Sequence, residues 1–291
     1  MGIIYGSLNV DEKYSKILEP NLFYDSVFVP GVTYTDKYET GPAGGIYVHK
    51  LSTSAVEPGT PGRDFTDEAT SDSLIQIKIN NNYQKSKKIY GVQAAAVDIA
   101  LANEQLSIAT KEVKESWNQS ALACLVKEGT TNSVTTEITD SIATDAVIDE
   151  RSAIVKAKGR ADVVLCSPDF FAMLLKEAGD KFTPVHNDKV AATGAIGSYL
   201  GMTFIEVPGL AATNAKYYGN TGTTANTVAF ANIAFVMYNH EALSIVNNLE
   251  AMRIVDSENF VGSKAQVEMN SGFAVTNSAL VRIRKSVKAT G

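Results

Sequence analysis

Residue types that often carry catalysis are few in this sequence and widely spaced. The three histidines and two cysteines are His49, His186, His240, Cys124 and Cys166. No two histidines have the HExxH spacing of zinc proteases, and none lies beside a cysteine that it could activate. The cysteines have no metal-type partner at short spacing, so buried thiols are expected. We therefore predict no enzyme activity, no catalytic residues, no metal site and no cofactor.

A cluster of glycines is the nearest approach to a nucleotide-binding loop. Gly194, Gly197 and Gly201 do not match GxGxxG or the P-loop pattern, and the GxSxG nucleophile elbow is missing around Ser198. A tight turn before a strand is the preferred interpretation. A soluble α/β enzyme with its pocket near Gly194–Gly201 and His186 is kept as an alternative.

A run of carboxylates lies in a polar stretch, rich in proline and glycine, between residues 56 and 72. The carboxylates are Asp64, Asp67, Glu68 and Asp72. They lack the alternating ligand order of an EF-hand loop, so a solvated segment is expected. On either side, residues 46–51 and 74–79 have the apolar pattern of strands. The segment predicts a long hairpin, whose tip is either loose in solvent or a projection that grips a neighbouring subunit.

The strongest element signal is a long helix. No proline or internal glycine interrupts the sequence from Gly91 to Glu128. Apolar residues recur there at spacings of three and four: Val92, Ala96, Ile99, Leu106, Val113, Trp117 and Cys124. This pattern predicts a helix over residues 92–127, with Gly129 as its stop. Its ~54 Å length would equal the width of a compact globule of this chain length, so we predict an elongated molecule with the helix as its spine.

The second half of the chain alternates between helix and strand patterns, which favours an α/β unit. Helices are expected over Asp145–Ala157 and from Ser167-Pro168 to Gly179. Strands are expected at Asp162–Cys166, Thr203–Val207 and Val228–Val236, with a loop over Ala211–Asn226. The tail, Ala265–Lys285, alternates like a β-hairpin that turns near Asn277.

Composition narrows the class of protein. The net charge is −6, with 45% hydrophobic and 20% charged residues, which excludes a disordered chain and a strongly basic nucleic-acid-binding domain. No apolar run approaches the ~18 residues of a membrane helix, and no signal peptide is visible.

Two short basic runs, Lys85–Lys88 and Arg282–Lys288, lack interleaved aromatic residues and are expected on solvated faces.

Two segments carry a resemblance to a known family. Residues 161–171, ADVVLCSPDFF, are a hydrophobic strand that leads into a Ser-Pro helix. Residues 194–207, GAIGSYLGMTFIEV, contain a G-x-I-G-x-x-L-G-M pattern that leads into a strand. With these segments, and with the order of elements along nearly the whole chain, the sequence resembles the major capsid proteins of tailed bacteriophages with the HK97 fold.

The resemblance implies a fold class and a domain plan. The class is α+β, an HK97-like capsid fold with an N-terminal arm, an extended β-hairpin (E-loop), a long spine helix, a peripheral domain and an α/β axial domain. The implied bounds are 1–44 for the arm, 45–80 for the E-loop, 81–144 for the peripheral domain with its spine helix at 92–127, 145–248 for the axial domain, and 249–291 for the closing strands of the peripheral domain.

The resemblance also implies what the chain does and with what. Copies would form hexamers and pentamers that close into an icosahedral shell around double-stranded DNA, without sequence-specific binding. The implied setting is a virion assembled in the host cytoplasm, and the implied partners are a separate scaffolding protein, a portal and decoration proteins, with no membrane. An encapsulin-like compartment, built on the same fold, is the alternative.

The arm and the hairpin are the segments expected to contact neighbouring subunits. A long helix, a projecting hairpin and a loose arm leave much surface and little core, so contacts between copies must supply stability. The residues expected at these contacts are Leu22, Phe23, Phe28, Arg63, Asp64, Phe65, Asp67 and Glu68.

Overall fold

The computed structural model of the chain describes residues 27–38, 45–51, 72–91, 101–134, 136–178, 183–184, 195–219 and 224–286. Within them the α-helices are α2 (Leu101–Glu128), α3 (Ala143–Lys156) and α4 (Pro168–Ala178). The strands are β1 (Gly45–Leu51), β2 (Asp72–Lys78), β3 (Asn81–Tyr90), β4 (Thr130–Thr131), β5 (Val163–Cys166), β6 (Thr183–Pro184), β7 (Ala195–Tyr199), β8 (Met202–Glu206), β9 (Asn214–Tyr217), β10 (Asn226–Ala229), β11 (Ile233–Tyr238), β12 (Leu243–Asp256), β13 (Gly262–Val275) and β14 (Val281–Lys285). Short 3-10 turns are η2 (Pro208–Ala211), η3 (His240–Ala242) and η4 (Ser278–Leu280).

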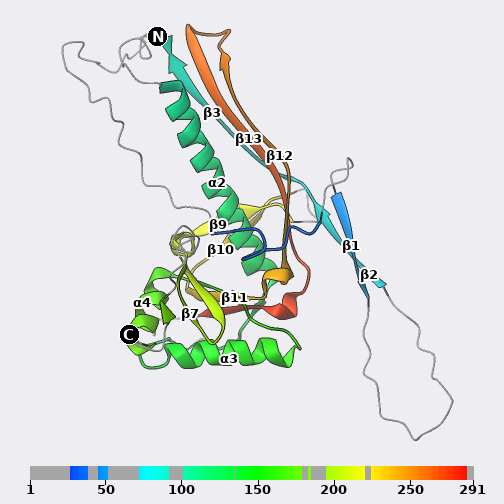
Figure 1. Cartoon of the computed structure of the whole chain (residues 1–291), viewed down its shortest axis with the longest axis vertical. Coiled ribbons are helices and arrows are strands. Elements are labelled where there is room, and N and C mark those ends of the chain that lie inside the picture. The colour runs from blue at the N-terminus through cyan, green and yellow to red at the C-terminus, as the bar shows by residue number, and fades with distance from the viewer. Residues whose placement is uncertain are drawn as a thin grey trace, which may run out of the picture.

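The molecule has three parts that are distinct in Figure 1. A body contains α3, α4 and a seven-stranded sheet. From it α2 and the long strands β3, β13 and β12 run side by side in one direction. The β1–β2 hairpin stands away from both parts. This layout agrees with the elongated shape predicted from the length of the helix.

The long helix packs against a three-stranded antiparallel sheet, in the order β12-β13-β3. Val113, Trp117 and Cys124 are buried on the helix face toward this sheet and the body core, which confirms the predicted stripe from Leu101 onward. Residues 92–100 of the predicted helix lie outside the described residues. The helix ends before Gly129, where a Cβ atom would lie 2.6 Å from the main-chain oxygen of Leu125. Only glycine fits this contact, so the sequence signal for the stop has a steric cause.

The seven-stranded sheet is the middle layer of the body, in the order β4-β14-β11-β5-β8-β7-β6. The two faces of β5 enter different cores. Val163 and Leu165 join the core shared with α2, whereas Val164 and Cys166 join the core that contains α3 and α4. This period-two division is that of a strand buried on both faces. β11, buried at every position, confirms the same expectation for its apolar run.

Two predicted assignments in the second half of the chain, one strand and one loop, are wrong in detail. The run Val228–Val236 is split, because Asn232 adopts the left-handed conformation with φ of 62° between β10 and β11. β10 then pairs with β9. β9 lies inside the stretch predicted as a loop, and it alternates exposed and buried residues over only four positions, too few for a clear periodic signal.

The tail does not form the predicted hairpin. Its turn lies near Asn277, whose side chain accepts a hydrogen bond from the main-chain nitrogen of Ala279 at 3.2 Å. However, β13 pairs with β12 and β3, whereas β14 pairs with β11. The chain therefore crosses from the long sheet to the body sheet at this turn. Alternation shows that a segment is a strand, but it does not show which strand is its partner.

The two basic runs are only partly solvated. Lys85 and Lys87 lie in β3, a strand that the sequence did not predict, and both pair with Glu112 of α2, at 3.0 and 2.6 Å. In the second run, Arg282 Nε lies 3.0 Å from the fully buried Glu150 of α3. In both places basic side chains join one layer of the fold to the next. The helices in the described part of the chain include none with the length and hydropathy of a membrane-spanning segment.

Candidate functional site

The two cysteines do not form a reactive centre. Cys124 and Cys166 are fully buried and belong to different cores. Burial raises the pKa of each thiol well above its ordinary value. Because the thiolate is the nucleophilic form, both side chains are expected to be inert in the folded chain.

The described histidines pair with carboxylates in two separate places. His49 Nδ1 lies 2.5 Å from Asp72 across the hairpin, and His240 Nδ1 lies 2.9 Å from Asp162 beside the start of β5. His186 and Gly194 lie outside the described residues, so the enzyme pocket expected near Gly194–Gly201 and His186 stays untested. Within the described ranges, no group of three or more His, Cys, Asp or Glu residues is placed to hold a metal ion.

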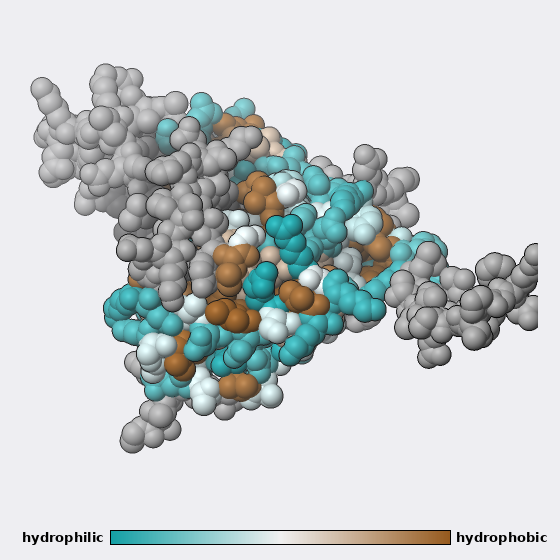
Figure 2. All heavy atoms as spheres, turned by 60° about the horizontal axis from the view of Figure 1, so that its bottom comes forward, coloured by the Kyte–Doolittle hydropathy of each residue, from teal (hydrophilic) through white to brown (hydrophobic). Residues whose placement is uncertain are grey.

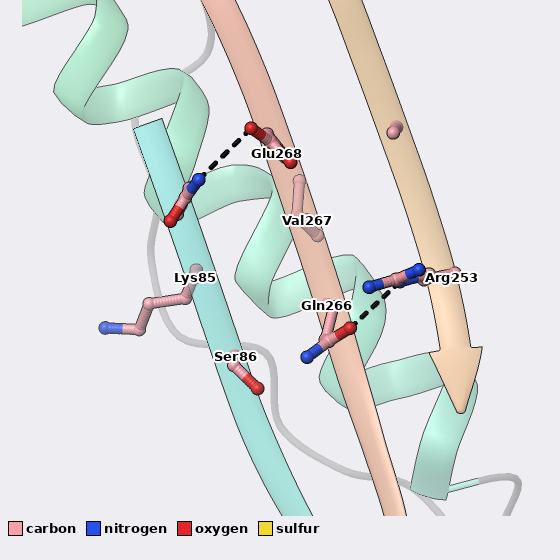
Figure 3. Close-up of a pocket in the computed structure, with 8 residues that line it drawn as sticks. Lys85, Ser86, Arg253, Gln266, Val267 and Glu268 are labelled. Carbon is pink, nitrogen blue, oxygen red and sulfur yellow. Dashed lines mark hydrogen bonds between the residues drawn. The ribbon is translucent and has the colours of Figure 1, made fainter. Parts of the chain in front are cut away.

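An open groove of about 490 Å³ lies on the long sheet (Figure 3). Its described lining residues are Gln84, Lys85, Ser86, Ala251, Arg253, Gln266, Val267 and Glu268. The polar groups bind one another: Arg253 Nε donates to Gln266 at 2.9 Å, and Gln84 donates to Glu268 at 3.1 Å (Figure 3). Such cross-strand pairs stabilise a sheet, and they do not assemble a nucleophile, a base and an orienting group.

The hairpin exposes apolar residues on both of its faces. β1 and β2 pair in antiparallel register from Gly45 opposite Lys78 to Leu51 opposite Asp72. On one face Tyr47 is 59% exposed and Leu74 is 58% exposed. On the other face Val48 and Ile75 are paired and only half-buried. Large apolar side chains on both faces of a projecting two-stranded ribbon indicate a surface that is completed by contact with another molecule.

The root of the hairpin, in contrast, is anchored to its own chain. Ile77 is fully buried and packs with Val246 and Ala274 of the long strands β12 and β13. Ile46 lies opposite Ile77 and is partly buried against the same cluster. Val48 also packs against this cluster. The ribbon is thus fixed at one end and along part of one face, whereas Tyr47 and Leu74 on the other face are exposed.

The described part of the arm packs inside its own subunit. Phe28 is 3% exposed and meets Trp117 edge to face, with ring centroids 6.1 Å apart. Tyr34 meets the same indole at 6.3 Å. Thr35 then forms a bridge with Ser244 at the edge of β12. Phe28 therefore differs from the expectation that it contacts a neighbour, because α2 offers it an aromatic pocket within the same chain.

The remaining predicted contact residues lie outside the described residues. They are Leu22 and Phe23 of the arm and Arg63, Asp64, Phe65, Asp67 and Glu68 of the hairpin tip. The structure brings none of them together, and they stay predictions. Tyr47 and Leu74 were not among the expected residues, although their apolar type in a polar, alternating strand was a usable signal.

The outer side of the body has its own exposed apolar residues. Val147 and Ile154 of α3 are buried, whereas Ile148 and Val155 are 43% and 50% exposed. Leu175 of α4 is also exposed. Figure 2 shows this end of the molecule with apolar patches separated by polar residues. Scattered patches of this size occur on ordinary soluble proteins, so the hairpin is the stronger candidate for a contact surface.

Solved phage structures share this fold over nearly the whole chain. The capsid structure of cyanophage P-SCSP1u superimposes with a TM-score of 0.72 at 12% identity, over 96% of this chain and 93% of that chain. A structure from Mycobacterium phage Che8 gives 0.67 at 15% identity, over 94% and 96%. The mature capsid of bacteriophage PhiM1 gives 0.67 at 12% identity, over 96% and 92%. No family model and no curated protein matches the sequence.

The likeness establishes the fold of the chain. The arrangement of helices and strands in this chain agrees with that in phage capsid structures, at a sequence identity of 12%, so the fold is the shared property. The predicted capsid-type α+β fold is therefore confirmed.

Proposed function

We propose that this chain is the major capsid protein of a tailed bacteriophage, which self-assembles into hexamers and pentamers of an icosahedral shell. The observation that carries the proposal is the structural likeness to two phage capsid structures, each of which covers 96% of this chain. A likeness of that extent includes the projecting parts as well as the core.

The exposed hairpin supports the same proposal on physical grounds. A two-stranded ribbon is marginally stable alone in water, and here Tyr47 and Leu74 leave apolar surface uncovered. Burial against another copy would remove that surface from water and stabilise ribbon and assembly together. Heterologous contacts of this kind close into rings when the rotation between copies permits.

In this proposal the parts of the chain take the roles of an HK97-like subunit. Residues 45–80 are the E-loop, α2 is the spine helix, and the arm precedes them. The axial domain is the body with the seven-stranded sheet, and the peripheral domain is the long sheet with α2. In this proposal three strands belong to other parts than in the sequence-based plan: β12 begins at Leu243 within the long sheet, and β4 and β14 belong to the body sheet.

The proposed partners follow from the proposed role. The shell would enclose double-stranded DNA inside a virion assembled in the host cytoplasm, with a separate scaffolding protein, a portal and decoration proteins as further partners. A net charge of −6 suits a container for DNA, because it disfavours tight binding to phosphates. In this role the chain is a structural protein and not an enzyme.

Electron microscopy of the purified chain, with its scaffolding protein where assembly requires one, tests the proposal. Capsomers or closed shells are expected. A compact monomer that persists at high concentration would contradict a shell role. The contents distinguish the alternative: nucleic acid inside particles fits a capsid, whereas a packaged protein would identify an encapsulin-like compartment.

A further inference from the structure

The hairpin joins the rest of the chain through a very short connection. β2 ends at Lys78 and β3 begins at Asn81, so only Ile79 and Asn80 lie between them. β2 pairs with β1, whereas β3 pairs with β13, and Figure 1 shows the two strands leaving the connection in different directions. Rotation about the main-chain bonds of two residues would swing the whole hairpin. Some interaction must therefore set its direction.

At this point the side chain of Asn81 forms hydrogen bonds with the main chain of a segment that is distant in sequence. Its Oδ1 accepts a hydrogen bond from the nitrogen of Tyr218 at 2.7 Å, and its Nδ2 donates to the oxygen of Tyr218 at 3.1 Å. Asn80 Nδ2 donates to the oxygen of Gly219 at 3.0 Å. Asn81 is only 3% exposed. One amide group thus satisfies both main-chain groups of a residue, as a neighbouring strand would.

The segment to which Asn81 binds is itself hydrogen-bonded to α2, the long helix. Tyr218 directly follows β9. In β9 the oxygen of Lys216 accepts a hydrogen bond from Ser120 of α2 at 2.8 Å, and the hydroxyl of Tyr217 donates to Glu128 of α2 at 3.2 Å. The Asn81 hydrogen bonds therefore join the base of the hairpin to the long helix α2.

Contacts on the other side complete the geometry. A Cβ atom at Gly272 of β13 would lie 2.6 Å from the oxygen of Lys78, so the glycine lets the last residue of the hairpin approach β13. Ile77 supplies apolar burial beside it. Apolar burial holds the root in place but has little directional preference. Asn81 itself is held in the β3–β13 ladder opposite Ser271, and its Nδ2 also donates to Oδ1 of Asn80 in the connection at 3.1 Å. These hydrogen bonds have defined angles, and they relate the connection to the fixed start of β3.

We propose that Asn81 is a positioning residue: its side chain fixes the direction of the β1–β2 hairpin within each subunit, before any neighbour binds. The consequence for assembly rests on the proposed function. In a shell subunit, a hairpin whose direction is already fixed loses less conformational freedom when it binds a neighbouring subunit. This lower entropic cost strengthens the contact. The direction itself is a property of the single chain and can be measured as such.

The experiment is a distance measurement between two spin labels within one chain. Labels are attached at Tyr47→Cys on the hairpin and Ser152→Cys on α3, both exposed positions. The native cysteines are fully buried and do not compete for the label. Labelled chain is diluted with an excess of unlabelled chain, so that the measured distance lies within one chain in any state of assembly.

Three variants are compared with the wild type. Asn81→Ala removes both hydrogen bonds to Tyr218. Asn81→Asp keeps the shape and the acceptor, but it sets a carboxylate against the oxygen of Tyr218. Asn82→Ala is the matched control, because this adjacent asparagine is exposed and donates to the half-buried Glu268 instead. Should Asn81→Ala fail to fold, Asn80→Ala serves in its place: it removes the bond to Gly219 and the bond that Asn80 Oδ1 accepts from Asn81, and it leaves both bonds between Asn81 and Tyr218.

The wild type and Asn82→Ala should give one narrow distance distribution, and both Asn81 variants a broadened or shifted one at an unchanged helix content. A wild-type distribution in the Asn81 variants would overturn the proposal, as would a broad distribution in the wild type. Shell formation is scored separately by electron microscopy. Wild-type distances in Asn81→Ala refute the positioning role even if shells form, whereas altered distances support it even if the chain forms no shell.

Discussion

Replacing Leu74 by alanine separates the stability of one subunit from the strength of its contacts. Leu74 is 58% exposed in the single chain. A neighbouring subunit could therefore remove more than half of the accessible surface of this leucine from water. Complete burial of a leucine is worth roughly 1.5–3 kcal/mol, and that share of it is about 0.9–1.7 kcal/mol. Since 1.4 kcal/mol is a tenfold change in an equilibrium constant, each hairpin contact should weaken by about 4- to 20-fold.

The assay is the concentration at which the purified chain begins to form large particles, followed by static light scattering over a dilution series. Leu74→Ala should raise that concentration and leave the melting temperature of the unassembled chain almost unchanged. Ile77→Ala is the matched control, because Ile77 is fully buried at the root of the same hairpin. It should instead lower the free energy of unfolding of the single chain by ~2–5 kcal/mol. If Leu74→Ala folds normally and assembles at the wild-type concentration, Leu74 is not buried between subunits and the reasoning fails.

Three further predictions concern the single chain. Glu150→Gln should lower the free energy of unfolding by ~3–5 kcal/mol in chemical denaturation, because it leaves the guanidinium of Arg282 without its buried counter-charge. Burial raises the pKa of Glu128, so the folded state binds its proton more tightly than the unfolded state does. Wild type should therefore gain stability relative to Glu128→Gln as the pH falls from neutrality towards 4.5, the ordinary value, and the difference should level off below it. Phe28→Ala should cost up to ~3–5 kcal/mol and alter the fluorescence of Trp117, the sole tryptophan, which loses an aromatic neighbour.

Controls and contrary outcomes for these variants are specific. Asp149→Asn, an exposed neighbour of Glu150 on α3, should change stability by no more than ~0.5 kcal/mol. An equal loss in both variants would show that the buried ion pair is not the cause. A stability difference between wild type and Glu128→Gln that is constant with pH would contradict the direction of the pKa shift. Unchanged Trp117 emission in Phe28→Ala would show that the arm does not rest on the helix in solution.

The elements that the sequence predicted well are those whose burial is periodic and local. The stripe of Val113, Trp117 and Cys124 identifies the long helix because one face of it is buried throughout. The Ser167-Pro168 pair predicted the start of α4 equally well. The Ser167 hydroxyl caps this helix by accepting a long hydrogen bond of 3.4 Å from the nitrogen of Phe170. Both signals come from residues a few positions apart.

The features that the sequence did not predict depend on partners far along the chain. β3 was missed because Lys85 and Lys87 occupy its face toward α2, and a lysine counts as polar until Glu112 is known to lie opposite. β14 was assigned to a tail hairpin because nothing local shows that its partner is β11. Phe28 was placed at a contact between subunits because its pocket is formed by Trp117, 89 positions later in the chain.

The candidate contact surface was predicted as a segment but not as residues. The pattern of residues 45–80 indicated a long hairpin, and the two paired strands confirm it. The expected contacts were placed at the charged tip, whereas the described strands expose Tyr47 and Leu74. Exposure depends on what the rest of the chain covers, and the alternating pattern of a ribbon does not show which of its faces the body will bury.

A reconstruction by electron cryomicroscopy of the particles that the purified chain forms is the most direct test of a shell subunit stabilised by its neighbours. We predict a closed icosahedral shell in which the hairpin of each copy lies across another copy, with Tyr47 and Leu74 buried at that contact. A chain that stays monomeric, or a particle whose hairpins fold back onto their own subunits, would contradict it.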